Sequence, residues 1–249
     1  MIVQENKKTT PVSNDNEVLV EYPYTQKDPY ARVELVASSR VYGGRYSCDQ
    51  VPALAARVSH AASGKTGKDL DKDKRLMNYL AKHQHFTPFE HQSATFKVIL
   101  PLLVARHWMR HRTQSYNEVS MRYSADPVGK FYYPHEWRIQ AKSNKQSSFG
   151  AVEDQAGCDK VLKELYDHAL AAYKQLLEKG VCREQARMVV PVGNYTEFYA
   201  TANLRNWMAF YRLRSADDAQ WEIRQYAQAI GRILEKIWPE SWGSLKNSL

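Results

Sequence analysis

Apolar and polar residues alternate in two early segments of this chain and recur at helical spacing along much of its last third. The alternation over 18–22 and 33–37 predicts strands, and a third strand is expected over 93–100. Between these strands, residues 51–62 and 69–83 have the i, i+3, i+4 spacing of helices. The pattern therefore predicts a small sheet in the first half of the chain, with short helices between its strands.

Residues 101–112 are predicted to be helical, and four more helices are predicted towards the C-terminus. These helices are 159–179, with Asp159 as N-cap and Gly180 as the stop, then 183–190, a segment from the capping candidate Thr196 to Arg214, and 223–237. Strands early and helices late are typical of an α+β fold. We therefore expect a modest, mostly antiparallel sheet packed against a layer of helices.

Two segments differ in character from the rest of the chain. Residues 1–32 are interpreted as a polar N-terminal extension, and the turn-rich stretch near 138–158 as an inserted, exposed loop. The length of 249 residues suits one large domain or two small ones. The remainder, 33–249, is expected to form a single α+β domain.

The net charge and the cysteines narrow the possible functions. Lys and Arg number 35 against 27 Asp and Glu, so the formal net charge is +8 and the chain attracts anions such as nucleotides or nucleic acid. No apolar run approaches the ~18 residues of a membrane span, and the first residues lack the apolar core of a signal peptide. The three cysteines have no C-x-x-C spacing and are expected to be reduced. We expect a cytoplasmic protein without membrane contacts.

Polar and charged residues suited to binding or catalysis are most concentrated between Arg110 and Tyr123, with Arg106 and His107 just upstream. Arginine forks bind phosphate in a planar, bidentate way, and the interspersed Asn, Ser and Glu side chains can orient a ligand. A second cluster comprises Arg183, Arg187, Asn203, Arg205, Arg212 and Arg214. The alternative is that both clusters are solvated, charged helix ends whose arginines complement the helix dipole.

A metal site is a further possibility near the first cluster. His83, His85 and His91 lie close to Glu90, and imidazole is the commonest zinc ligand. The spacing is not that of an H-E-x-x-H pair, however, and Thr87-Pro88 interrupts any common helix face. No metal ion is expected.

One motif is specific enough to suggest a family. Arg110-His111-Arg112, seven residues and then Ser120 resembles the R-H-R-x7-S signature of the flavin-dependent thymidylate synthases. Three further blocks occur in the order typical of that family, and the resemblance covers roughly 45–240. The blocks are His85-x-Thr87-Pro88-Phe89-Glu90-His91, Gly180-Val181-x-Arg183-Glu184-x-Ala186-Arg187 and Asp218-Ala219-Gln220-Trp221-Glu222-Ile223.

The resemblance implies a reaction, its cofactor and an assembly. Proteins similar to this one make dTMP from dUMP, taking the methylene group from methylene-tetrahydrofolate and the hydride from NADPH by way of FAD. They are homotetramers with active sites between subunits, and neither nucleic acid nor membrane is a partner. A Ser120 nucleophile is not expected, because no His-Asp pair is placed to activate it.

The resemblance also implies the site residues. dUMP would contact His107, Arg110, Glu118, Ser120, Met121, Arg122, Arg187 and Arg214, with Arg214 and Ser120 in the catalytic roles. FAD would contact His85, Thr87, Glu90, Arg110, His111, Arg112, Glu118, Asn203 and Arg205. The chain departs from the family pattern at His107, where Gln is frequent, at Ala209, where Asn is usual, and at Asp218, where His is usual.

Two other functions remain open at this point. A protein that binds RNA or single-stranded DNA would explain the net charge and the arginines interleaved with Trp108, Tyr116 and Tyr123, which could stack on bases. A relative of the same fold that methylates a different nucleotide, or an inactive relative, would explain the motifs.

Overall fold

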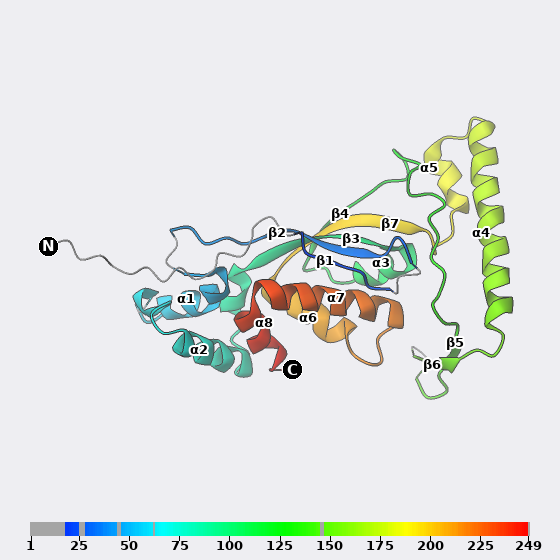
Figure 1. Cartoon of the computed structure of the whole chain (residues 1–249). Helices are drawn as coiled ribbons and strands as arrows, with labels where there is room; N and C mark the ends of the chain where they lie inside the picture. Colours follow the sequence, from blue (N-terminus) through cyan, green and yellow to red (C-terminus); the bar gives the residue numbers. More distant parts are fainter. Residues whose placement is uncertain (1–17, 25–27, 44–45, 62, 145–146, 249) are drawn as a thin grey trace.

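A five-stranded antiparallel sheet lies at the centre of the part of the chain that the computed structural model describes, with strand order β1-β2-β3-β7-β4 (Figure 1). The structure describes residues 18–24, 28–43, 46–61, 63–144 and 147–248. The strands are β1 (Val20–Glu21), β2 (Arg32–Ser38), β3 (Ser93–Pro101), β4 (Ser115–Glu118), β5 (Arg138–Gln140), β6 (Ser148–Ala151) and β7 (Tyr195–Asn203). The helices are α1 (Val51–Val58), α2 (Leu70–Lys82), α3 (Leu102–Trp108), α4 (Gln155–Glu178), α5 (Arg183–Ala186), α6 (Leu204–Arg214), α7 (Trp221–Ile237) and α8 (Pro239–Lys246). The predicted α+β class and antiparallel sheet are confirmed.

β3 and β7 form the long central pair of this sheet, in register from Ser93 opposite Asn203 to Pro101 opposite Tyr195. β7 corrects the sequence interpretation, which predicted a helix from Thr196. In the structure the chain is extended to Asn203, whose side chain then caps α6 by accepting from the backbone N–H of Asn206 at 2.9 Å. Alternate residues of β7 are buried against the helices, as the period of a strand requires.

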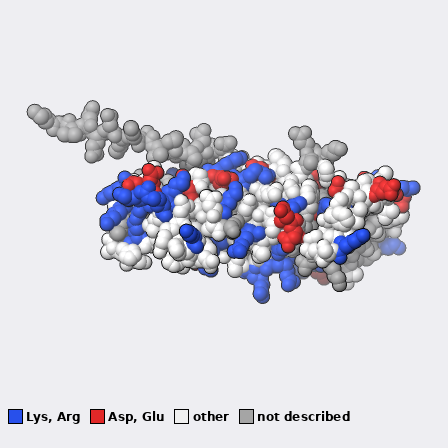
Figure 2. Space-filling model, turned by 90° about the horizontal axis from the view of Figure 1, so that it is seen from below, with Lys and Arg blue, Asp and Glu red and all other residues white. Residues whose placement is uncertain are grey.

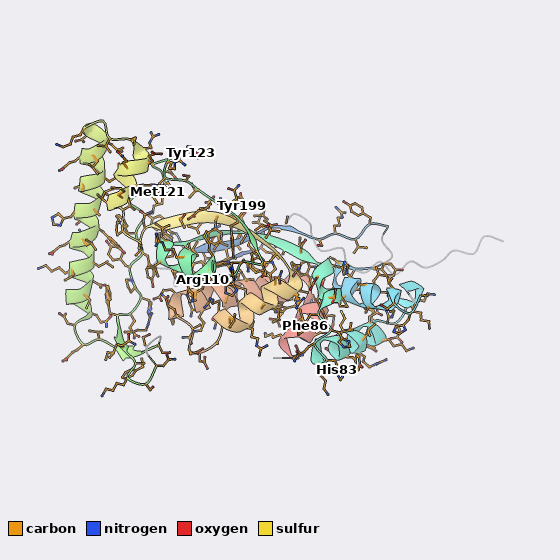
Figure 3. The ribbon with its side chains drawn as sticks, turned by 180° about the vertical axis from the view of Figure 1, so that it is seen from behind. His83, Phe86, Arg110, Met121, Tyr123 and Tyr199 are labelled. Atoms are coloured by element: carbon orange, nitrogen blue, oxygen red, sulfur yellow. The ribbon has the colours of Figure 1, made fainter. Side chains whose placement is uncertain are left out.

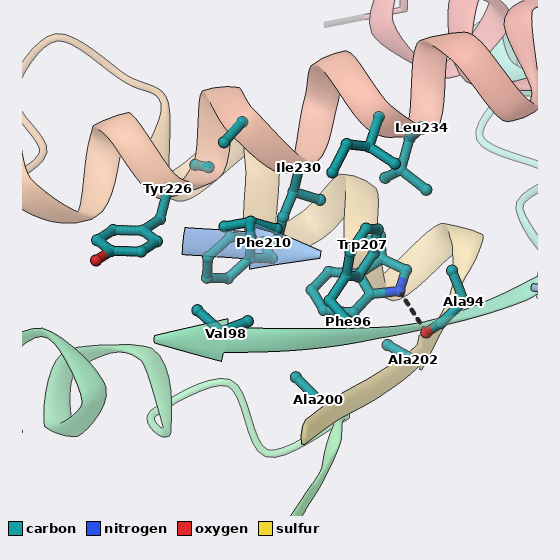
Figure 4. Packing of buried hydrophobic residues seen from close by; sticks show 14 of the residues in the cluster. Ala94, Phe96, Val98, Ala200, Ala202, Trp207, Phe210, Tyr226, Ile230 and Leu234 are labelled. Carbon is teal, nitrogen blue, oxygen red and sulfur yellow. Dashed lines mark hydrogen bonds between the residues drawn. The ribbon is translucent and has the colours of Figure 1, made fainter. Parts of the chain in front are cut away.

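Helices α6 and α7 cover one face of the sheet and enclose the core (Figure 4). The Trp207 indole stacks edge-on against Phe96, with ring centroids 5.0 Å apart, and donates its N–H to the Ala94 carbonyl at 3.1 Å. Tyr226 of α7 donates to the Ile99 carbonyl at 2.8 Å. A buried indole or phenol costs free energy without a partner, so these bonds fix both helices to β3.

The remaining helices lie at the two ends of the molecule. α1, α2 and α8 form one end, and α4 and α5 lie at the opposite end, apart from the helical layer (Figure 1). α4 begins earlier than predicted, because Asp154 rather than Asp159 caps it and accepts from the Gly157 N–H at 2.8 Å. Asp159 instead accepts from the Trp137 indole at 2.8 Å. None of the helices that the structure describes has both the length and the hydropathy needed to cross a bilayer.

The predicted extension and the predicted inserted loop both contain regular structure. Val20–Glu21 is the edge strand of the sheet, whereas the polar residues 1–17 lie outside the described residues. Most of the stretch 138–158 is the hairpin of β5 and β6 followed by the first turn of α4. Arg138 joins this hairpin to α7 through an ion pair with buried Glu222, at 2.8 Å. The division into an extension, one domain and an insertion stays a prediction.

Candidate functional site

The predicted site residues fall into three groups along the molecule (Figure 3). The central group, at the end of α3, in β4 and at the end of α6, comprises His107, Arg110, His111, Arg112, Glu118 and Arg214. The α5 group comprises Ser120, Met121, Arg122 and Arg187. The η3 group, around the 3-10 helix Thr87–His91 and the start of α6, comprises His85, Thr87, Glu90, Asn203 and Arg205. Figure 3 shows Arg110 between Met121, which lies near α5, and Phe86 at the other end.

The turn that contains Arg110 and Arg112 is fixed from beneath by two aromatic side chains. Trp108 is fully buried and donates its indole N–H to the Gln114 side chain at 3.0 Å. The Tyr116 hydroxyl donates to the His111 carbonyl at 2.7 Å. The core therefore positions the backbone of the turn, and both arginine side chains extend to the surface.

Arg214, the last residue of α6, contacts two imidazoles of the central group. Its Nε donates to His111 Nε2 at 2.8 Å, and its Nη1 contacts His107 Nε2. Burial, and then the nearby guanidinium, lower the pKa of His111 to about 4 and that of His107 below its usual value. Burial also lowers the pKa of Arg214. At neutral pH, two neutral imidazoles therefore hold a half-buried cation.

Glu118 is the last residue of β4 and is exposed. Its Oε1 accepts from the Thr196 hydroxyl at 2.7 Å. Glu118 also lies opposite Phe198 of β7, so the sheet determines its place. Thr196, which the sequence interpretation treated as a helix cap, is thus a positioning neighbour of a site residue. The alternation of apolar residues along 195–202 is the signal that could have identified it.

The α5 group is more exposed and is linked by polar contacts. Arg122 pairs with Glu184 at 3.2 Å, and Arg187 Nε donates to the Glu184 carbonyl at 3.3 Å. The Ser120 Oγ accepts from the Arg122 N–H at 3.2 Å. In the described part of the chain this backbone N–H, not an imidazole, is the neighbour of the Ser120 hydroxyl, which suits a ligand rather than a nucleophile. Sequence reasoning missed Glu184 as a site residue, although its motif contains it.

The η3 group is built around Arg205, near the start of α6. Its guanidinium pairs with Glu90 and lies over the Phe86 ring, 5.8 Å from the centroid. Asn203 uses its side-chain oxygen to cap α6, which leaves its amide N–H₂ to donate to a ligand. Thr87 and His85 are exposed beside this pair.

The other candidates are placed as follows. Ala209 is exposed on α6, and Asp218 is exposed in the turn that follows this helix. Across the described residues, no three His, Cys, Asp or Glu side chains lie close enough together to hold a metal ion. The imidazole of His83 instead packs at a tilt against Tyr79, with ring centroids 4.3 Å apart.

Comparison with known proteins places this arrangement in a family. Residues 45–240 match the family model described as thymidylate synthase complementing protein. A flavin-dependent thymidylate synthase of Thermus thermophilus is 46% identical over 201 residues, which cover 81% of this chain and 73% of that protein. The enzyme of the same name from Thermosipho africanus is 43% identical over 77% of this chain and 83% of its own length.

A solved structure agrees with these relatives. The UMP/dUMP methylase PolB from Streptomyces cacaoi, bound with 5-Br dUMP, superposes with a TM-score of 0.75 at 34% identity, over 86% of this chain and 94% of that one. The matched region contains all three groups of site residues. The chain therefore belongs to the family of flavin-dependent thymidylate synthases.

Proposed function

We propose that this chain methylates dUMP to dTMP, with a flavin as the source of the reducing hydride. The observation that supports this most directly is Arg214, a half-buried cation held by two neutral imidazoles beside the R-H-R turn. A fixed cation of this kind stabilises negative charge that develops on a bound ligand. The uracil ring acquires such charge when N3 loses its proton, and this activates C5 towards the one-carbon donor.

The residues of the chain suit a uracil nucleotide. PolB, which shares the fold, is a methylase of UMP and dUMP. In this chain Arg122 and Arg187 provide guanidinium groups for a 5′-phosphate, and the Ser120 hydroxyl lies beside them. Met121 is half-buried in the same turn and provides an apolar contact. We assign phosphate binding to the α5 group and recognition of the uracil ring to His107, Arg110, Glu118 and Arg214.

The donor set also fits a flavin dinucleotide. The pyrophosphate of FAD has two negative charges, and Arg110, Arg112 and Arg205 present exposed guanidinium groups to such an anion. In the same turn the buried Gln114 amide nitrogen has no hydrogen-bond partner among the described residues. Buried donors are normally satisfied, so this amide is consistent with a missing acceptor. His85, Thr87, Glu90, His111, Glu118 and Asn203 complete the proposed flavin contacts. When bound, the reduced flavin supplies the hydride of the reaction.

A thiol nucleophile has little support in the structure. Burial raises the pKa of Cys48, so this thiol stays protonated and is a poor nucleophile. Cys182 is exposed at the start of a four-residue helix. We therefore assign activation of the pyrimidine to the charged groups of the site rather than to a thiol. The proposed one-carbon donor is methylene-tetrahydrofolate, and the proposed reductant is NADPH.

We further propose that the active chain is a homotetramer with sites between subunits. The three groups are spread along one chain, which favours completion of each site by a neighbouring copy (Figure 3). Two large apolar side chains beside site residues are exposed in the single chain: Met188 is 81% exposed and Leu213 is 60% exposed. Both side chains are therefore candidates for a contact with another copy of the chain. Light scattering of the Met188→Ser and Leu213→Ser variants tests this, and a loss of mass is expected.

The first experiment is anaerobic dTMP formation from dUMP, methylene-tetrahydrofolate, FAD and NADPH, with FAD omitted as the control. Product that depends on FAD supports the proposal. Basic side chains also gather over α1 and α2 and near the middle of one face (Figure 2). A protein that takes up no flavin but binds oligonucleotides with strong salt dependence would therefore favour nucleic-acid binding instead.

A further inference from the structure

The Arg214 guanidinium contacts two histidines of the central group, His107 and His111. We propose that His107 and His111 are positioning residues: as neutral hydrogen-bond acceptors they hold the Arg214 guanidinium in place, and a proton gained by either one releases it. The inference rests on the proposed function only for its effect on turnover. The contact itself and its response to protonation can be measured without substrate or cofactor.

The geometry determines the protonation state that the contact needs. Arginine can only donate, so each imidazole must offer the lone pair of Nε2 and have its proton on Nδ1. Two edges of the guanidinium are used in this way, and the remaining N–H groups are available to a ligand. An imidazolium has no lone pair with which to accept a hydrogen bond. It also repels the Arg214 cation, so protonation of either histidine breaks its contact with the guanidinium.

The ring of His111 is held from behind and the backbone of His107 is fixed in α3, so both can position the arginine. The His111 ring lies against Phe210, with centroids 5.0 Å apart. Its backbone N–H donates to the Trp108 carbonyl at 3.0 Å, and its carbonyl accepts from Tyr116. His107 is in the last turn of α3, next to fully buried Trp108. The arginine, in contrast, ends α6 on a long side chain.

The charged group that faces the two imidazoles is Arg214, and it favours their neutral form. Arg214 faces them from α6, and from α3 the neighbour of His111 is the neutral imidazole of His107. From β4, Tyr116 is neutral, because burial raises its pKa to about 12. The direction of the pKa shifts agrees with this, since burial and Arg214 lower the pKa of both histidines.

The contact can be measured without any turnover. Chains labelled with ¹³C and ¹⁵N at histidine give the pKa of each imidazole and its tautomer by NMR. In Arg214→Leu, the pKa of His107 and that of His111 should both rise, on the order of one pH unit, because a nearby cation has been removed. The exposed His168 of α4 should not change. Unchanged pKa values for His107 and His111 would show that the contact does not exist in solution.

Kinetics then test whether the contact matters for the reaction. In His107→Gln an amide oxygen can accept from Arg214 but cannot titrate, so the acid limb of kcat/KM for dUMP should move to lower pH, towards the pKa of His111 at about 4. In His107→Leu the acceptor is lost, and kcat should fall at every pH. The matched control, His168→Gln, should keep the profile of the original protein.

The outcomes separate this inference from the proposed function. An unchanged acid limb in His107→Gln, or full kcat in His107→Leu, would overturn the positioning role. A protein that makes no dTMP but shows the NMR response has the contact and lacks the function. A protein that makes dTMP but shows no NMR response has the function and lacks the contact.

Discussion

The central group and the α5 group both use arginine, but they hold it in different ways. Arg214 is half-buried and has two neutral acceptors and no carboxylate beside it among the described residues, so its charge is not compensated. Arg122 is 49% exposed and pairs with Glu184, itself 55% exposed. An exposed pair contributes only ~0–1 kcal/mol to stability, so a ligand phosphate can displace the carboxylate at little cost. The first arrangement suits charge that develops during a reaction, and the second suits charge that the ligand already has.

Replacing Arg214 should have the largest effect. We expect Arg214→Ala to lower kcat by about 10²–10³-fold, as removal of a preorganised charge donor does. The melting temperature should stay the same or rise, because a partly desolvated cation without a counter-ion is removed. Steady-state kinetics and thermal unfolding measure both quantities.

The matched control for this prediction is the neighbouring Arg212, which is exposed on the same helix. Arg212→Ala should leave kcat unchanged. If both variants keep full turnover, the cation at the end of α6 is not catalytic and the comparison above fails.

Removing a phosphate-binding arginine should act on binding instead. Arg187→Ala loses one charged hydrogen bond of about 1.5–3 kcal/mol, which corresponds to roughly a 10- to 100-fold higher KM for dUMP. The kcat should change little, because the phosphate is equally charged in the ground state and the transition state. The effect should shrink at high salt. A fall in kcat with KM unchanged would show that the α5 group takes part in the chemical step.

A smaller effect is expected at Glu184, which shares its contacts with Arg122 and Arg187. Glu184→Gln removes the competing carboxylate while its backbone carbonyl still accepts from Arg187. dUMP should therefore bind a few-fold more tightly, and stability should change by less than about 1 kcal/mol. Calorimetric titration measures this. Weaker binding of dUMP would instead assign Glu184 a direct contact with the nucleotide.

The elements of the fold differ in how well their conformation could be predicted from the sequence. α2, β3 and α7 each bury one face against a single layer, and their apolar spacing is unambiguous. β7 lies between β3 and β4 and runs directly into α6, so its apolar residues merge with the helical pattern that follows. Pairing with β3 and β4, which are distant in sequence, decides its conformation. Local pattern alone could not supply that information.

The candidate site, too, could be predicted from the sequence only in part. The R-H-R-x7-S motif located the residues of the central group and the α5 group in the sequence. It could not show that Arg214 meets His107 and His111, because residues more than a hundred positions apart are brought together only by the packing of α6 against α3. Nor could it show that Glu184 occupies the guanidinium of Arg122, because that pair depends on where α5 lies.

The last expected effect concerns stability and pH, and it distinguishes the two regions without any substrate. The folded chain holds His111 with a pKa of about 4, below the 6.5 of a free imidazole. As pH falls from 6.5 to 4, the unfolded chain gains a proton that the folded chain does not, so the free energy of unfolding decreases. His111→Gln should make this decrease shallower, whereas Glu184→Gln and His168→Gln should not. Urea unfolding at fixed protein concentration across this range measures the slope. An equal slope in His111→Gln would mean that the folded chain does not keep this imidazole neutral. The Arg214 cation would then lack its neutral acceptor, and the contrast with Arg122 of the α5 group would not hold.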